Sequence, residues 1–414
     1  LNCEGIIDLK IPDWVTSLGS YSFSHCAGLN GTLKIPDNVQ FIDYSAFSYC
    51  LQLRYLEIGR GITEINGEVF RSCTSLVNIT IPEWVTSIGE LSFAYCRGVY
   101  GTLIIPDNVN RVELGAFSYC SGINELNIGK NLNELNISVF AFCSNLSSLV
   151  IPDTVEFIGI YAFSNCYGIQ GTITIPDTVS KIDIYGFYNC AGFDHLKIGN
   201  GLNDISQAVF QGCSNLSSIE FPENNLSIGS EAFSLCGIKG TLNLPDNIIY
   251  VNDSAFANCI LITKINFGKG ITEINENLFA NCTGLTELSI PNWITCIKSY
   301  AFASCYAISG TISIPSSVKL IDSYAFTLCS GFSDLIIEYG LSEIGQYAFS
   351  YCSGLKKIQF TDSITVIDEY AFYYCSGING TLTLPNSITT IKSGAFCRCT
   401  GIQGTLIIPD SISK

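Results

Sequence analysis

The stretch that decides the fold is Ala46-Phe47-Ser48-Tyr49-Cys50, because its core, Phe-x-x-Cys, returns every 23 or 24 residues along the chain. A Cys follows three residues after each phenylalanine of this series, which comprises Phe23, Phe47, Phe70, Phe93, Phe117, Phe140, Phe163, Phe187, Phe210, Phe233, Phe256, Phe279, Phe302, Phe326, Phe349, Phe372 and Phe396. A fixed period of this length is typical of stacked repeats. We therefore expect residues 1–414 to form one continuous solenoid of about 18 coils rather than separate globular domains.

The residues between successive cysteines predict the path of one coil. The Ile-x-Ile step, such as Ile173 with Ile175, alternates with period two and predicts a very short strand. All twelve prolines follow this step, and proline ends a strand because it has no amide hydrogen to donate. The apolar pair after the turn, such as Val155 and Ile158, predicts a second short extended segment.

Two further expectations concern the end of the coil. Ala-Phe-x-x-Cys fits one helical or 3₁₀ turn, because residues three apart share a face. The Gly that often follows two residues after the Cys, as at Gly98 or Gly122, predicts a left-handed backbone conformation.

One coil cannot fold alone. Fixing about 23 residues costs roughly 1–2 kcal/mol each in backbone entropy. One buried Phe and a few aliphatic side chains return only about 1.5–3 kcal/mol apiece. Each coil must therefore cover its neighbours, which predicts a mainly β solenoid with short parallel strands.

A longer period of about 70 residues, or three coils, is superimposed on the repeat. Its marker is Gly-Thr-Leu or Gly-Thr-Ile before the strand, at Gly31, Gly101, Gly171, Gly240, Gly310 and Gly380. The following coil usually has Gly in place of Pro, and it carries an acidic residue at Glu64, Glu134, Asp204, Glu273 or Glu343. Duplication of a three-coil block explains this pattern, and a binding rail with a pitch of about 14 Å is the alternative. The last unit breaks phase, because Gly404 follows Gly380 by one coil.

Composition and charge exclude several function classes. The net charge of −16 argues against a nucleic-acid partner, because phosphate binding needs Lys and Arg. No apolar run reaches 18 residues, so direct membrane insertion of this segment is not expected. The chain has no Met and no signal peptide, and it begins and ends within repeats, so we expect it to be part of a longer protein.

The cysteines and histidines predict a framework rather than a catalytic centre or a cofactor site. Cys3 and the Cys of each Phe-x-x-Cys form one ladder, which we interpret as buried free thiols, with a ladder of disulfides as the alternative. Zinc sites need closely paired ligands, and Cys397-Arg398-Cys399 does not match that spacing. With only His25 and His195 in the chain, a His-based triad is poorly supported, so we predict no enzymatic activity, no metal and no cofactor.

Residues outside the repeat framework are the candidates for partner contacts. Trp14, Trp84 and Trp293 all occupy the turn slot after Pro and an acid or Asn, where they either contact a partner or pack over a neighbouring turn. Tyrosines recur two residues before the Phe and again directly before the Cys, and we expect these two rows to mix core lining with an adhesive face.

Asn-x-Ser/Thr sequons give a weak signal for N-glycosylation, because a chain rich in Asn, Ser and Thr produces about half as many by chance. The candidate acceptors are Asn30, Asn78, Asn136, Asn145, Asn215, Asn225, Asn252 and Asn379. Asn281 also lies in a sequon, but we expect it to be too enclosed for modification because it precedes the ladder residue Cys282.

The repeat resembles that of the BspA-like leucine-rich repeat family, Leu-x-x-Ile-x-Ile-Pro-x-x-Val-x-x-Ile-x-x-x-Ala-Phe-x-x-Cys, over essentially the whole chain. The resemblance implies a curved, right-handed leucine-rich solenoid. It also implies an extracellular or cell-surface role in adhesion or recognition, with a protein or glycan ligand and no catalytic residues. The alternative function is a structural protein that stacks on copies of itself into an extracellular filament or surface layer.

Overall fold

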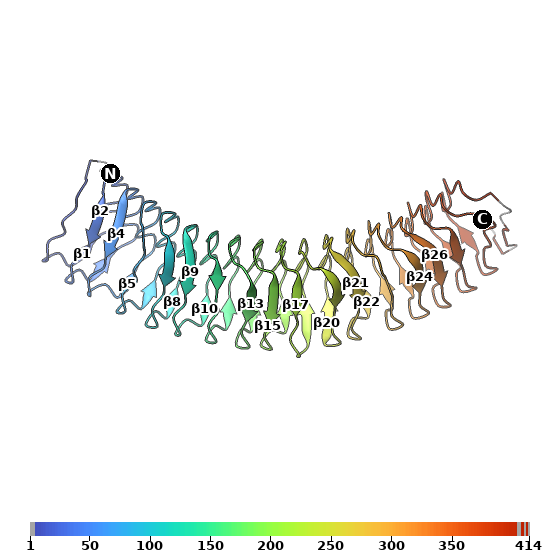
Figure 1. Ribbon diagram of the computed structural model, residues 1–414, viewed down its shortest axis with the longest axis horizontal. Helices are drawn as coiled ribbons and strands as arrows, with labels where there is room; N and C mark the ends of the chain where they lie inside the picture. The colour runs from blue at the N-terminus through green and yellow to red at the C-terminus, as the bar shows by residue number, and fades with distance from the viewer. Residues whose placement is uncertain (1–4, 404–406, 410, 413–414) are drawn as a thin grey trace. The chain divides into compact units, whose positions relative to one another are not determined.

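The computed structural model describes residues 5–403, 407–409 and 411–412, so that Cys3 and Gly404 lie outside the described residues. The chain falls into two compact units, Leu1–Pro222 and Glu223–Lys414. Within each unit, successive coils lie side by side and their strands pair in parallel, which confirms the predicted β-solenoid (Figure 1).

The first strand of each coil coincides with the Leu-x-x-Ile-x-Ile segment, and together these strands form the first strand row. In the first unit this row contains β2 (Gly31–Lys34), β4 (Leu53–Glu57), β7 (Gly101–Ile104), β9 (Ile123–Asn127), β11 (Ser148–Leu149), β13 (Thr172–Ile175), β15 (His195–Ile198) and β17 (Ser218–Glu220). In the second unit it contains β19 (Gly240–Asn243), β21 (Ile262–Asn266), β24 (Gly310–Ile314), β26 (Phe332–Ile337) and β28 (Lys357–Gln359). Inward aliphatic side chains alternate with outward polar ones, as the period-two pattern predicted.

The second extended segment is also confirmed, and its strands form the second strand row beyond the proline turn. In the first unit this row contains β1 (Ser17–Leu18), β3 (Phe41–Ile42), β5 (Glu64–Ile65), β6 (Ser87–Ile88), β8 (Arg111–Val112), β10 (Glu134–Leu135), β12 (Phe157–Ile158), β14 (Lys181–Ile182) and β16 (Asp204–Ile205). In the second unit it contains β18 (Leu226–Ile228), β20 (Ile248–Val251), β22 (Glu273–Ile274), β23 (Cys296–Ile297), β25 (Leu320–Ile321), β27 (Glu343–Ile344), β29 (Val366–Ile367) and β30 (Thr390–Ile391).

The predicted helical or 3₁₀ turn at Ala-Phe-x-x-Cys is wrong, because the described residues contain no helix. Alternate amides in this segment donate to the next coil: Phe117 N donates to Val139 O at 3.0 Å and Tyr119 N to Ala141 O at 2.7 Å. The amides between them close tight turns within the coil, as when Cys120 N donates to Phe117 O at 3.3 Å. A helix would need every amide to bond along its own axis.

The residues two before and two after the Phe have positive φ in almost every coil, which also excludes a helix. Tyr119 has φ of 60°, Tyr161 of 56° and Leu235 of 61°. The left-handed region costs an L-residue roughly 1–2 kcal/mol. The hydrogen bonds to the next coil hold these residues there, so the segment behaves as a third ladder between coils.

The core is a continuous stack of the repeated phenylalanines within each unit. Neighbouring rings lie nearly parallel, with centroids 5.6 Å apart for Phe93 and Phe117 and 5.2 Å for Phe326 and Phe349. These four side chains are fully buried. Each stabilises the fold by about 1.5–3 kcal/mol, and only because the adjacent coils cover it.

Fifteen of the ladder thiols, from Cys50 to Cys399, donate to the carbonyl oxygen of the Phe in the preceding coil. Phe163 O accepts hydrogen bonds both from Cys166 N of its own coil, at 3.2 Å, and from Cys190 Sγ of the next coil, at 3.0 Å. Every cysteine among the described residues is a free thiol, which agrees with the buried-thiol interpretation and not with the disulfide ladder. Burial raises the pKa of Cys120 to about 12, so the thiol stays protonated and keeps its hydrogen to donate.

The glycine after each Cys is present for a different reason from the one predicted, because its φ lies outside the left-handed region. A Cβ on Gly122 would lie 2.2 Å from Val99 O, and one on Gly192 would lie 2.3 Å from Tyr167 O. These glycines let the backbone of one coil approach the carbonyl groups of the preceding coil.

We predict that Gly122→Ala lowers the midpoint of urea unfolding, with a loss of more than about 2 kcal/mol, because the new methyl group forces two coils apart. Gly19→Ala is the matched control, since a Cβ there meets nothing within 4 Å and φ is not positive. Urea unfolding followed by circular dichroism measures both variants. Equal midpoints for the two variants would contradict the close-approach explanation.

The buried thiols predict alkaline destabilisation. An unfolded thiol ionises near pH 8.5, whereas a ladder thiol such as Cys120 stays protonated to about pH 12. Because the folded-state pKa is raised, the stabilisation is fully present below about pH 8.5 and is lost as pH rises towards 12, by roughly 1.4 kcal/mol per thiol and pH unit. The urea midpoint should therefore fall steeply above pH 8.5.

Thiol counting provides the independent check on the same ladder. Cys397 is exposed and should react quickly in the native protein, and denatured protein should show all twenty thiols. Cys397→Ser should leave the alkaline midpoint shift unchanged. A clearly lower denatured count would restore the disulfide alternative.

Candidate functional site on the strand and turn faces

The structure separates the three tryptophans into two kinds. Trp84 and Trp293 are half-buried, and each Nε1 donates to a glycine carbonyl of the preceding coil, Gly59 O at 3.0 Å and Gly268 O at 3.2 Å. These two rings pack over a neighbouring turn, one of the two alternatives that the sequence left open. Trp14 is 82% exposed, so it remains a candidate for a partner contact.

The acidic residues of the three-coil period begin strands of the second row, and all of them are exposed. Glu273 pairs with Lys298 at 2.8 Å and Glu343 with Lys392 at 3.7 Å, while burial raises the pKa of Asp204. Members of the same unit, such as Glu64 and Glu134, lie three coils apart, so the fold does not bring them into one site.

The sequon asparagines also differ in their surroundings. The asparagines with exposed side chains are Asn30, Asn78, Asn145, Asn215, Asn225 and Asn379. Asn136 is half-buried and its Nδ2 donates to Val112 O at 2.9 Å, so a glycan there would break a bond between coils. Asn252 is also half-buried. Asn281, which we expected to be enclosed, is instead exposed.

The Gly-Thr coils interrupt the first strand row, a feature that the sequence analysis did not predict. In the first unit the row divides into the sheets β2–β4, β7–β9–β11 and β13–β15–β17, and in the second unit into β19–β21 and β24–β26–β28. The pairing register shifts at the Gly-Thr step, as between Gly101 and Thr102, and Gly101 has φ of 85°. Gly101 and Thr102 face Ile123 and Glu125 of β9, so this irregularity is a β-bulge. In the sequence, the sign of this irregularity was that successive repeated Phe residues are 24 apart, rather than 23, in most of the Gly-Thr coils.

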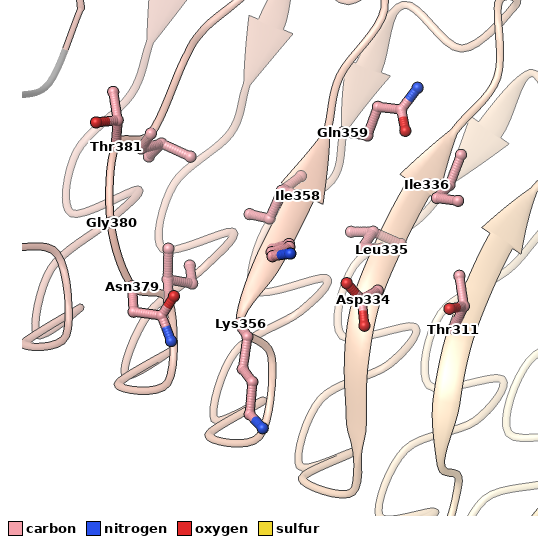
Figure 2. Close-up of a pocket in the computed structure, with 13 residues that line it drawn as sticks. Thr311, Asp334, Leu335, Ile336, Lys356, Ile358, Gln359, Asn379, Gly380 and Thr381 are labelled. Carbon is pink, nitrogen blue, oxygen red and sulfur yellow. The ribbon is translucent and has the colours of Figure 1, made fainter.

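A hollow of about 540 Å³ opens in the second unit at one such interruption (Figure 2). Its floor is the aliphatic row of β26 and β28, and its rim includes Thr311, Asp334 and the segment Asn379–Thr381. Asn379 N still donates to Lys356 O at 3.2 Å, but the strand pairing of β28 does not continue to residues 380–382. Ile358 is consequently half-exposed, whereas Leu335 is buried.

The hollow differs in charge from the rest of this acidic chain. Lys356 and Lys357 both line it and are exposed, and no ion pair within the described residues includes either of them. In the preceding block the register neighbours Lys264 and Glu287 form an ion pair of 2.9 Å, and Glu287 stands where this block has Lys357. Two unpaired ammonium groups beside Thr and Asn side chains can bind an anionic or hydroxyl-rich ligand.

The two tyrosine rows lie on the turn face, the surface formed by the residues from two before each Phe to the Cys. In the second unit Tyr300, Tyr324, Tyr347 and Tyr370 stack coil upon coil, with centroids 4.7 to 4.9 Å apart. The rings are partly exposed, so these rows add an outer aromatic stack to the buried phenylalanine stack.

Both histidines contact side chains of the next coil, and Nε2 of His195 lies 4.0 Å from Glu220 Oε2. The His25 ring stacks on Tyr49 at 4.5 Å, while Nδ1 of His195 shares a hydrogen bond of 2.8 Å with Ser218 Oγ. Within residues 5–403, 407–409 and 411–412, no group of three or more His, Cys, Asp or Glu residues is placed to hold a metal ion. Among the same residues, none forms a helix of the length and apolarity needed to cross a membrane.

The repeat and its coil geometry agree with one protein family. The family model for the BspA type leucine rich repeat region matches in six copies, over residues 1–124, 75–170, 133–262, 203–331, 251–379 and 310–414. This chain belongs to the BspA-type leucine-rich repeat family. No curated protein matches the chain in sequence.

The chain is similar to several solved structures of bacterial proteins, and the first of them shares its fold. A leucine-rich repeat protein from Bacteroides ovatus is 23% identical, with a TM-score of 0.57, over 83% of this chain and 82% of that protein. A leucine rich cell surface protein from Faecalibacterium prausnitzii is 29% identical over 84% and 78% of the two chains, with a TM-score of 0.36. The pneumococcal vaccine antigen PcpA is 17% identical over 86% and 80%, also with a TM-score of 0.36.

The tryptophan contacts predict unequal effects of two identical substitutions. Trp84→Ala should lower stability by about 1–3 kcal/mol, because it removes ring packing and the bond to Gly59 O. Trp14→Ala should change stability by less than about 0.5 kcal/mol, since the ring is exposed. Urea midpoints measure both, and equal losses would show that Trp14 is also a structural residue.

Proposed function

We propose that this chain is a non-catalytic recognition solenoid of a secreted or cell-surface protein, which binds a protein or glycan ligand in adhesion. The observation that carries the proposal is the open hollow at the interruption of the first strand row, with the unpaired Lys356 and Lys357 at its edge. Membership of the BspA-type family supports it.

The form of the hollow supports recognition. Its floor consists of β26 and β28, whose positions are fixed by the stack, so little conformational entropy of these strands is lost on binding. Lys357 stands in register with Asp334 on the neighbouring strand, and Thr311 in register with Asp334. This row therefore offers a hydroxyl, a carboxylate and an ammonium group side by side. The two ammonium groups of the hollow attract an anionic ligand to a protein that is otherwise acidic.

An array of glycans and extracellular-matrix proteins tests the proposal with purified protein. We expect anionic ligands, such as sulfated or sialylated glycans, to bind, and the double variant Lys356→Glu/Lys357→Glu to weaken that binding at least tenfold. The double variant Lys130→Glu/Lys269→Glu is the control, because it makes the same charge change at two exposed positions that do not line the hollow. Binding that is insensitive to Lys356→Glu/Lys357→Glu would remove the hollow from the proposal.

Location and self-association are tested separately. Labelling of intact source cells with a membrane-impermeant biotin reagent should modify the protein if it is secreted or surface-bound. Sedimentation and electron microscopy distinguish a monomeric recognition protein from the filament alternative. Long regular fibres that grow with protein concentration would favour the structural function instead.

A further inference from the structure

A second surface, the turn face of the first unit, contains a groove that the strand-face proposal does not use. The residue directly after the repeated Phe is small in four consecutive coils, Ala94, Ser118, Ala141 and Ser164, and the last three of these residues form the floor of the groove. Large residues stand in the same slot at the two ends, Arg71 and Tyr188. Between them lies a groove of about 430 Å³.

One wall of the groove is a rigid aromatic stack. The ring centroids of Tyr95 and Tyr119 are 4.4 Å apart, and those of Tyr119 and Phe142 are 4.3 Å apart, with nearly parallel planes. All three side chains are partly exposed. Because the stack fixes their rotamers, these rings lose little conformational entropy when a ligand packs against them. Leu91 and Tyr161 add apolar surface to the groove.

The stacking also determines which surface the rings offer. Each inner ring face is covered by its neighbour, so a ligand meets ring edges and hydroxyl groups rather than open faces. Aromatic edges carry partial positive charge, which favours edge-to-face contact with an aromatic ligand side chain and attraction to negative groups. The wall is therefore better suited to binding aromatic and aliphatic side chains than to binding a sugar ring, which would stack flat on an open ring face.

Charge at one end of the groove selects among such ligands. Arg71 is the only charged residue that lines the groove, and its guanidinium lies 5.9 Å from the centroid of Tyr95. The guanidinium of Arg97 lies 5.8 Å from the same ring. Nη1 of Arg71 donates to Glu68 Oε1 at 2.8 Å, but its buried Nε has no hydrogen-bond partner in the described structure. Arg71, whose side chain is 28% exposed, and Arg97 place two positive charges beside Tyr95 against the one carboxylate of Glu68, so a ligand carboxylate at this end is favoured.

We propose that this groove binds an extended segment of a partner protein that carries an acidic residue followed by aromatic or aliphatic side chains. The acidic residue lies at the Arg71 end, and the apolar side chains lie over Ser118 and Ala141 against the aromatic wall. The floor of small residues spans two coil steps, or about 10 Å, which accommodates about three extended residues. The inference rests on the proposed recognition function and names one class of partner for it.

Fluorescence anisotropy with two labelled peptides tests the groove in the full chain. The first peptide is Glu-Phe-Ala-Phe-Ala with blocked ends, and the second has Lys in place of Glu. We expect the acidic peptide to bind at least fivefold more tightly, and Arg71→Gln to abolish this preference. Equal binding of both peptides, or no binding of either, would overturn the proposal.

A variant that fills the groove supplies a matched control. Ala141→Leu should weaken the acidic peptide at least tenfold. Ala280→Leu makes the same change at the equivalent slot of the second unit, where the flanking residues are Asn277 and Asn281, and should leave binding unchanged. Equal loss in both variants, or in neither, contradicts the assignment of the groove.

Cross-linking of the unaltered protein covers the case in which a variant does not fold. An acidic peptide with benzoylphenylalanine at its first aromatic position should attach within residues 91–165, as read by mass spectrometry, and attachment elsewhere would refute the proposal. The strand-face variant Lys356→Glu/Lys357→Glu should keep full peptide binding. Failure of the groove and failure of the proposed strand-face function are thereby distinguished.

Discussion

The structure depends on the shared carbonyl of each repeated Phe. In the coil of Phe163 this oxygen accepts from the amide of Cys166 and from the thiol of Cys190 in the next coil. The first bond closes the turn and the second joins it to its neighbour, while the Phe ring stacks on that of the adjacent coil. Because folding and stacking use the same atoms, a coil without a neighbour loses both, and the framework tolerates little change in these slots.

This framework leaves two kinds of surface free for recognition. On the strand face, each sheet of the first row begins at a Gly-Thr coil, and in the second unit the end of the strand pairing at β28 opens the hollow beside Lys357. On the turn face, a run of small residues in the slot after the Phe leaves a groove beside Tyr119. Both surfaces arise from substitutions at positions that do not carry the stack, so they can vary while the fold stays constant.

The sequence predicted the parts of the fold that follow from burial and period. Two extended segments, a proline turn and buried Phe and Cys are all present, because each depends on an apolar pattern within one coil. The prediction of a helical turn at Ala-Phe-x-x-Cys was wrong because residues three apart share a face in two different structures. One is a helix, and the other is the observed series of tight turns, in which alternate amides bond to the next coil. The glycines after Cys were misassigned for the same reason, since the carbonyl near Gly122 belongs to another coil.

The sequence by itself determined the period, the family and the identity of the stacked residues, because these depend on local pattern repeated many times. Only the tertiary structure decided which outward residues form a surface. Trp84 packs over Gly59 while Trp14 is exposed, and residues as distant as Arg71 and Tyr188 close one groove. The physical reason is that contacts such as the bond from Trp84 to Gly59 and the stacking of Tyr95 on Tyr119 join different coils, where no local pattern records them.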